Sequence, residues 1–231
     1  MINEEIERSA RRAVRKHVVD SPYEEKFALL ANFLVLNERF APTRKKNGQI
    51  LEIGSEEYLD SLARSFLISR ADRAPAKPRT IPDKMIAFIL KHHYNVEIEK
   101  IEAIINAHQS SMAAENYVGY LLERYLASVL EPLGWVWCSG SSVTAVDFIK
   151  PPENESSSWQ MLQVKNRDNS ENSSSSRVRA GTAIKKWHRT FSATGATNWE
   201  AFPEPDAEGG LTEENFEIFV ADYLGRIKHG K

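Results

Sequence analysis

Two short apolar segments that carry polar side chains constrain this chain more than any other feature of its sequence. The segments Val143–Ile149 and Trp159–Asn166 have the length and apolar content of buried strands. Asp147 lies in the first, and Gln163 and Lys165 lie two positions apart in the second. Because side chains alternate along a strand, Gln163 and Lys165 are expected on one face, and pairing of the two strands would bring Asp147 beside them.

A carboxylate, an amide and an amine at the end of a sheet suit metal-assisted hydrolysis of a phosphodiester. A hard divalent cation such as Mg²⁺ takes oxygen ligands, which Asp147 and the amide of Gln163 could supply. Lys165 would lie near an activated water and a phosphate, where its charge stabilises the negative charge that develops. The same residues also fit a plainer interpretation, in which Asp147 faces a turn and Gln163 and Lys165 follow an ordinary edge-strand pattern.

A helix expected at 111–131 offers two further acids. Glu123 falls on or near its apolar face, where an ionised carboxylate is costly unless it is paired or bound to a metal. Glu115 is the second candidate, and Gly119 on its face would let another backbone approach closely. Both acids could instead lie at the polar border of an amphipathic helix. The apolar side chains that recur at helical spacing are Tyr117, Val118, Leu121, Leu122, Tyr125, Leu126, Val129 and Leu130.

The order of expected elements favours an α/β (α+β) fold with two regions. Residues 1–110 are expected to be a mostly helical N-terminal region, and residues 111–231 an α/β core that ends in a helix. The first three strands of the core are close enough in sequence for an antiparallel meander. Helices are expected at 3–19, 21–40, 55–69, 83–93, 98–108, 111–131, 180–191 and 211–227, and strands at 134–139, 143–149, 159–166 and 197–202.

Charge is unevenly distributed along a nearly neutral chain. The net charge over 231 residues is −2, but residues 159–189 hold seven Lys or Arg against two acids, and residues 200–217 hold seven acids and no base. This segregation predicts a local positive face. The single cysteine, Cys138, excludes an intrachain disulfide or a multi-cysteine zinc site and fits a reducing cytosol. We expect no membrane span and no signal peptide, so the protein is expected to be cytoplasmic.

Several of these residues occur in an order that resembles the PD-(D/E)XK nuclease superfamily. The resemblance implies a restriction-endonuclease-like core of helix, three-stranded meander, helix and strand, with Mg²⁺ as cofactor. It further implies that Asp147, Gln163 and Lys165 are catalytic and that Glu123 is a further acid of the metal site. Two residues depart from the pattern: Val146 stands where it has proline, and Gln163 stands where an acid is commoner. The loss of that negative charge should weaken metal binding. The matching segments are Leu122-Glu123-Arg124-Tyr125-Leu126, Leu133-Gly134-Trp135, Val146-Asp147 and Gln163-Val164-Lys165.

The basic stretch that follows is similar to type II restriction endonucleases of the SinI/AvaII kind, which cut double-stranded DNA at GGWCC. The similar residues are the run from Lys165 to Arg177 and the segment Gly181–Trp187. The resemblance implies a homodimer that leaves 5′-phosphate ends. Arg and Asn can pair with guanine and adenine edges, and basic side chains can contact phosphates. The candidates for base contacts are Asn166, Arg167, Asn169, Asn172, Arg177 and Arg179, and those for phosphate contacts are Lys185, Lys186, His188 and Arg189.

Two other functions fit the same residues. One is an Mrr-like or repair-type PD-(D/E)XK nuclease, which would recognise DNA structure rather than a short palindrome. The other is a non-catalytic DNA-binding module in which Gln163 marks a degenerate metal site. The serine- and asparagine-rich run 168–176 could also be a solvated loop with no partner.

Overall fold

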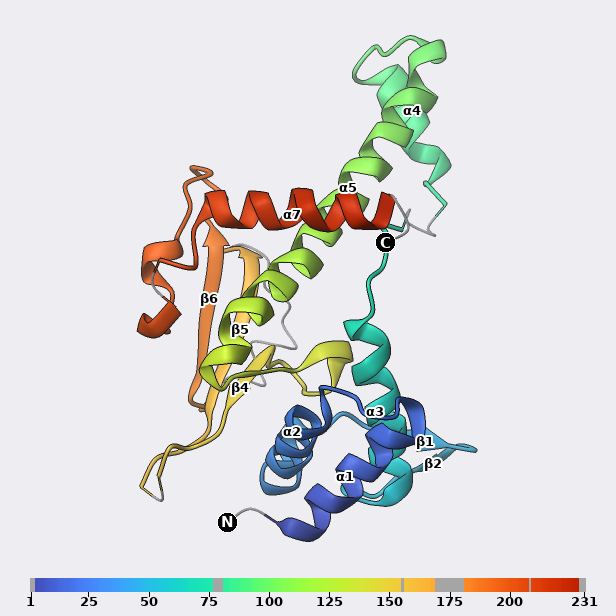
Figure 1. The fold of residues 1–231 in the computed structure, drawn as a ribbon. Coiled ribbons are helices and arrows are strands. Elements are labelled where there is room, and N and C mark those ends of the chain that lie inside the picture. The colour runs from blue at the N-terminus through green and yellow to red at the C-terminus, as the bar shows by residue number, and fades with distance from the viewer. Residues whose placement is uncertain (1–2, 77–80, 155, 169–180, 208, 229–231) are drawn as a thin grey trace.

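A four-stranded mixed sheet lies between two groups of helices (Figure 1). A computed structural model describes residues 3–76, 81–154, 156–168, 181–207 and 209–228 of the chain. One face of the sheet packs on helices α1 to α3, and the other packs on α5 and α7. The protein is therefore an α+β structure with helices on both faces of the sheet. The helices are α1 (Glu4–His17), α2 (Glu24–Leu36), α3 (Glu56–Arg70), α4 (Lys84–His92), α5 (Ile98–Leu130) and α7 (Glu213–Lys228), with short 3₁₀ turns at Glu38–Phe40, Glu131–Leu133, Ser139–Ser141, Trp199–Ala201 and Pro205–Ala207.

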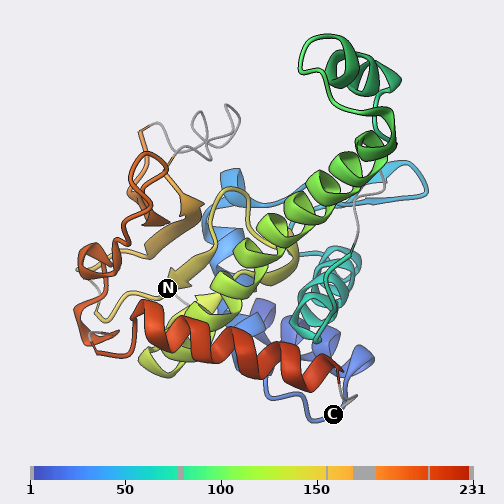
Figure 2. The same ribbon diagram turned by 90° about the horizontal axis from the view of Figure 1, so that it is seen from above.

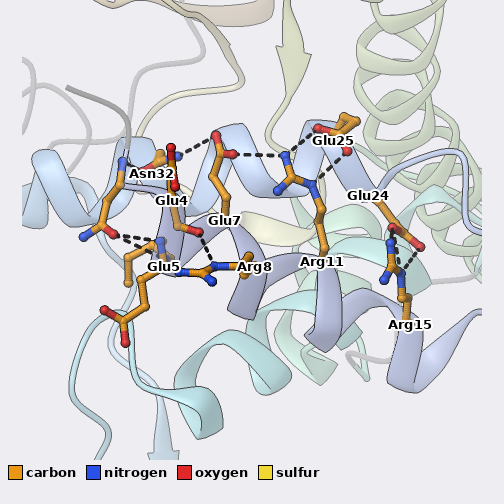
Figure 3. Close-up of polar contacts among 11 residues, drawn as sticks. Glu4, Glu5, Glu7, Arg8, Arg11, Arg15, Glu24, Glu25 and Asn32 are labelled. Atoms are coloured by element: carbon orange, nitrogen blue, oxygen red, sulfur yellow. Dashed lines mark hydrogen bonds and ion pairs between the residues drawn. The ribbon is translucent and has the colours of Figure 1, made fainter.

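The three N-terminal helices form a bundle with its own apolar interior. Phe27, Phe33, Leu62 and Phe66 are completely buried there. On the surface, α1 and α2 are joined by ion pairs between Arg11 and Glu25 and between Arg15 and Glu24, and Asn32 donates a hydrogen bond to Glu7 (Figure 3). Because exposed ion pairs contribute little stability each, burial of the apolar faces holds this bundle together.

The sheet confirms the expected antiparallel meander of three strands, and its fourth strand comes from residues 184–190 rather than from the expected 197–202. Its strands are β3 (Val136–Trp137), β4 (Phe148–Lys150), β5 (Gln160–Arg167) and β6 (Ile184–Thr190), in that order across the sheet. β3 and β4 are antiparallel, as are β4 and β5, whereas β5 and β6 are parallel. A small separate hairpin, β1 (Lys45–Lys46) with β2 (Gln49–Ile50), lies before α3.

The helix expected at 180–191 is wrong, because this segment forms β6. The apolar residues Ile184 and Trp187 have a spacing that also occurs on a helix. In the structure they lie on opposite faces of the sheet, with Ile184 against the N-terminal helices and Trp187 against α5 and α7. Pairing with β5 satisfies the backbone of both strands, and residues 168–183 make a connection long enough for a parallel pair.

The strand expected at 197–202 is also wrong. Thr197 makes a single bridge to Thr190, and the chain then forms the 3₁₀ turn Trp199–Ala201. The Trp199 ring packs against Trp187 and Tyr125, and its Nε1 donates to Glu213. Burial of this large ring decides the local conformation in place of strand pairing.

Two helices expected at 98–108 and 111–131 form one continuous helix, α5. Its C-terminal half packs on the sheet, whereas its N-terminal half and α4 project away from the rest of the molecule (Figure 2). The division at residue 110 stays a prediction, and α5 runs through that position. Within the described residues, no helix is both long and apolar enough to cross a membrane.

Candidate active site

Glu123, Asp147, Gln163 and Lys165 line one cavity of about 360 Å³ at the end of the sheet. Glu123 comes from α5, Asp147 precedes β4, and Gln163 and Lys165 lie on β5. The remaining wall comes mainly from the loop that joins β3 to β4. The four residues singled out in the sequence, which are up to 42 positions apart, therefore meet at a single site.

Asp147 lies in a loop rather than within a strand, because β4 begins at Phe148. Its backbone is fixed at two points: its N–H donates to Leu162 O at 2.9 Å, and its carbonyl accepts from Cys138 N at 2.8 Å. Its Oδ2 accepts a 2.7 Å hydrogen bond from the N–H of Val164. Burial raises the pKa of this carboxyl, although the bond from Val164 and the charge of Lys165 oppose the rise. The carboxylate is thus held in position in a poorly solvated place.

Glu123 reaches the cavity from α5, which packs on the face of the sheet opposite to the N-terminal helices. Its Oε2 accepts a 3.0 Å hydrogen bond from Trp137 Nε1. Burial, and next the charge of Asp147, raise the pKa of Glu123 to about 8. Two desolvated carboxylates that disfavour each other's ionisation are a common feature of sites that hold a cation.

Gln163 and Lys165 lie on one face of β5, as the strand pattern predicts. Gln163 is 2% exposed and Lys165 is half-buried. In β6, Lys186 is in register with Gln163 and His188 with Lys165, so these side chains share that face. The sheet therefore places two more basic residues on the face that carries Gln163 and Lys165.

A second cavity of about 380 Å³ adjoins the first. Glu123 and Lys165 line both, and Glu115, Gly119 and Arg167 line the second. Glu115 pairs with Arg167 across its mouth, with Oε1 and Nε 3.7 Å apart. Glu123, not Glu115, is thus the helix acid that shares a cavity with Asp147.

The residues expected to contact DNA are only partly within the described chain. Asn169, Asn172, Arg177 and Arg179 lie outside the described residues. Asn166 Oδ1 accepts from Arg189 Nε at 3.0 Å, and Arg189 also pairs with Glu213, so both belong to a fixed network at the end of the sheet. Lys185 is exposed, Lys186 lies on the cavity face, and Arg167 is at the mouth of the second cavity. Their roles in DNA binding stay predictions.

The donor set at the cavity fits a hard divalent cation. Glu123 and Asp147 offer carboxylate oxygens and Gln163 an amide oxygen, which are the ligand types that Mg²⁺ takes in proteins. Among the described residues, no group of three or more His, Cys, Asp and Glu side chains is gathered as a metal centre. A metal held here by three side chains would therefore need a third ligand of another type, and the Gln163 amide is the one that the sequence singled out.

Sequence reasoning missed the loop that closes the cavity. Gly140 has a φ of +72°, and a Cβ there would lie 2.5 Å from Ser65 O of α3. Ser139 Oγ donates to Phe66 O at 3.0 Å, so α3 holds this loop against the site. Ala145, two residues before Asp147, has a φ of +60° and also lines the cavity. The residues Gly140-Ser141-Ser142 predict a turn, but no local pattern in the sequence indicates the contact with α3.

Comparison with known proteins identifies the relatives of the chain. The SinI restriction endonuclease family matches residues 7–226. The type II restriction enzyme Eco47I of Escherichia coli is 50% identical over 203 residues, which cover 87% of each chain. The type II restriction enzyme SinI of Salmonella infantis is 48% identical over 204 residues, which cover 88% of each. The match spans nearly the whole chain, so the protein belongs to the SinI restriction endonuclease family and is a site-specific deoxyribonuclease.

Proposed function

We propose that this protein is a Mg²⁺-dependent type II restriction endonuclease that cuts double-stranded DNA at a short palindrome, GGWCC, and leaves 5′-phosphate and 3′-hydroxyl ends. The observation that carries the proposal is the meeting of Glu123, Asp147, Gln163 and Lys165 in one cavity. Relatives named as type II restriction enzymes support the kind of substrate. The protein would act in the cytosol.

Glu123, Asp147 and Gln163 would hold the metal in a site of the PD-(D/E)XK type. When bound, the ion supplies Lewis-acid charge at the phosphoryl oxygen. Its charge would also favour the ionised forms of both carboxyls, whose pKa values are raised by burial and, for Glu123, by the charge of Asp147 as well. The Val164 N–H and the Trp137 indole N–H each use one carboxylate oxygen, which orients both groups toward the cavity.

Lys165 would perform two tasks at the scissile phosphate. Its amine lies on the same face as Gln163 and close enough to Asp147 and Glu123 to lower the pKa of both carboxyls. From that position it can orient the attacking water in line with the leaving oxygen. Its positive charge can also stabilise the extra negative charge of the transition state.

DNA would approach the end of the sheet at which β5 and β6 present basic residues. Arg167 is the last residue of β5, and Lys186 and His188 share the face of Gln163 and Lys165. These groups suit phosphate and base contacts next to the scissile bond. Because each chain has one such site and a palindrome has two scissile bonds, a homodimer with one site for each strand is proposed.

The first test is cleavage of an unmethylated plasmid that contains GGWCC, in Mg²⁺ and in EDTA. The wild type should give discrete Mg²⁺-dependent bands, and Lys165→Ala should give none. Lys16→Ala, which removes a lysine from the surface of α1, is the matched control and should cut normally. A smear would favour an Mrr-like or repair-type nuclease, and salt-sensitive binding without cutting would favour a non-catalytic module, so either would overturn the proposal.

A further inference from the structure

The projecting part of the molecule exposes an unusual amount of apolar surface. We call residues 81–112, which contain α4 and the N-terminal half of α5, the hairpin arm. Figure 1 shows α4 lying beside the free end of α5, away from the sheet. Of the seventeen large apolar residues that are exposed in the described chain, nine lie in this arm: Ile81, Met85, Ile86, Phe88, Ile89, Tyr94, Ile98, Ile104 and Met112.

Helix α4 is apolar around most of its circumference, yet none of its residues is buried. One stripe, Ile86 and Leu90, lines an apolar groove of about 410 Å³ against Ile104 and Met112 of α5. Met85, Phe88 and Ile89 lie outside this groove and are 48–55% exposed. A helix that is apolar on all sides is normally covered by protein, so a partner is expected here.

The apolar area that the arm exposes is large for a monomer. The nine side chains are 41–93% exposed. At roughly 150–250 Å² for a large aromatic side chain, and less for Ile and Met, the nine together present somewhat under about 1,000 Å². The largest apolar patch on a typical monomer is about 300–600 Å², and each partner in a standard interface contributes about 800 Å². The arm therefore carries more apolar surface than is usual on a monomer, and a partner that covers one side of it would bury part of this area.

We propose that the hairpin arm is the dimer interface and that its partner is the arm of a second copy of this chain. The two helices carry complementary net charge: α4 has Lys84 and Lys91 and no acid, whereas the start of α5 has the exposed Glu99 and Glu102 and one base, Lys100, which pairs with Glu97 just before the helix. In a two-fold arrangement, α4 of each copy lies across the start of α5 of the other. Basic side chains then meet acidic ones twice, around an apolar centre.

This arrangement couples the interface to the active sites. The same helix, α5, carries the arm at its N-terminal half and Glu123 at its C-terminal half. A pair of arms would therefore set the distance between the two sites through two continuous helices. This coupling rests on the proposed cleavage of both strands, whereas the interface itself does not depend on any activity.

Sedimentation of the full chain without DNA tests the interface. At micromolar concentration the wild type should sediment at twice the 26.2 kDa protomer mass. Ile89→Glu should shift it to a monomer, with at least a tenfold weaker association. Ile218→Glu on α7 is the matched control, since Ile218 is 57% exposed and Ile89 48%, and it should stay dimeric. A monomeric wild type, or a dimer that Ile89→Glu leaves intact, overturns the proposal; the former result would point to another protein or a membrane surface as the occupant.

A charge-swap pair tests which helices meet. The variant Lys84→Glu with Lys91→Glu should be monomeric alone, and so should Glu99→Lys with Glu102→Lys. Mixed in equal amounts, the two should form a dimer, because each α4 then meets an α5 of opposite charge. Circular dichroism of each variant should match the wild type, since these four side chains are exposed in the protomer. Failure of the mixture to associate overturns the crossed arrangement.

Plasmid cleavage distinguishes failure of the interface proposal from failure of the nuclease proposal. Ile89→Glu should nick supercoiled plasmid and linearise it at least tenfold more slowly than the wild type. If the wild type does not cut at all but Ile89→Glu still dissociates it, the interface stands and the nuclease proposal fails. If Ile89→Glu stays dimeric and linearises normally, the nuclease proposal stands and the interface fails.

Discussion

Asp147 Oδ2 accepts a 2.7 Å hydrogen bond from the backbone N–H of Val164, the residue between Gln163 and Lys165. This contact joins the loop before β4 to the strand that carries the other two polar groups. It therefore fixes the position of the carboxylate relative to the amide and the amine. The bond uses one carboxylate oxygen only, so the other oxygen of Asp147 is available to a ligand.

The first prediction concerns Asp147→Asn. Asparagine can still accept the bond from Val164, but it has no charge to hold a metal. Cleavage should fall on the order of a thousandfold or more, while the unfolding temperature should stay equal or rise. The rise follows because the folded state disfavours the ionised carboxyl, as its raised pKa shows. Mg²⁺ should raise the unfolding temperature of the wild type and not of the variant.

Asp60→Asn is the control for that experiment, because Asp60 lies on the surface beside His17. It should cut and respond to Mg²⁺ as the wild type does. A large loss of thermal stability in Asp147→Asn would contradict the prediction, since it would show that the negative charge supports the fold.

The second prediction concerns the pH dependence of stability without metal. Burial and the charge of Asp147 raise the pKa of Glu123 from 4.5 to about 8. Between these pH values the folded chain keeps a proton that the unfolded chain has released. The contribution of Glu123 to the free energy of unfolding must therefore decrease as pH rises from about 5 to 8. Urea unfolding in EDTA at several pH values measures it.

Glu123→Gln should flatten that decrease, because an amide does not titrate in this range. The comparison of the two proteins isolates Glu123 from other groups. If the wild type and Glu123→Gln show parallel pH profiles in EDTA, Glu123 is not the group whose protonation differs between the folded and unfolded chains.

Period-two spacing was enough to predict that Gln163 and Lys165 share a face. The sequence also predicted Asp147 near them, but in a strand at 143–149, whereas Asp147 lies in the loop before β4. Glu123 could be expected near the site because a polar residue on the packed face of a helix needs a partner. The sequence failed at β6, where Ile184 and Trp187 suit either a helix or a strand. Pairing with β5, a contact between segments separated by residues 168–183, decided the outcome.

The wall of the cavity also depends on contacts between distant segments, and these could not be predicted from the sequence. Gly140 fits against Ser65 of α3, which lies 75 positions earlier in the chain, and no local pattern connects the two residues. The length of α5 was underestimated because its N-terminal half has few buried residues, so its helical pattern is weak there.

The third prediction concerns Arg70, which joins α3 to the start of the sheet. Its Nη2 lies 2.7 Å from Glu131 Oε1 and donates to Trp137 O at 2.9 Å, and its side chain is 4% exposed. Arg70→Ala would leave Glu131 without this partner, which should cost about 3–5 kcal/mol of unfolding free energy. Arg12→Ala, which breaks an exposed pair with Glu56, should cost about 1 kcal/mol or less. Denaturant unfolding measures both.

Replacing both members of the Arg70 pair gives a further check. Arg70→Met combined with Glu131→Leu should lose less stability than the sum of the two single variants, because neither charge is left alone. Strict additivity would show that the two side chains act independently despite their contact.

The fourth prediction separates stability from activity at Gly119. This glycine lies within α5 and lines the second cavity, and a Cβ there would meet no atom within 4 Å. Gly119→Ala should therefore stabilise the helix by up to about 1 kcal/mol. If DNA occupies this cavity, the added methyl group would displace it, and cleavage should fall by roughly tenfold to a hundredfold.

Gly225→Ala on α7 is the matched control for Gly119→Ala. It is also a helical glycine with no atom within 4 Å of a Cβ, but it lines neither cavity of the site. It should gain similar stability and cut at the rate of the wild type. Thermal unfolding and single-turnover cleavage measure the two properties. Unchanged cleavage by Gly119→Ala would show that the second cavity does not receive DNA, because the added methyl group would then have displaced nothing that cleavage needs.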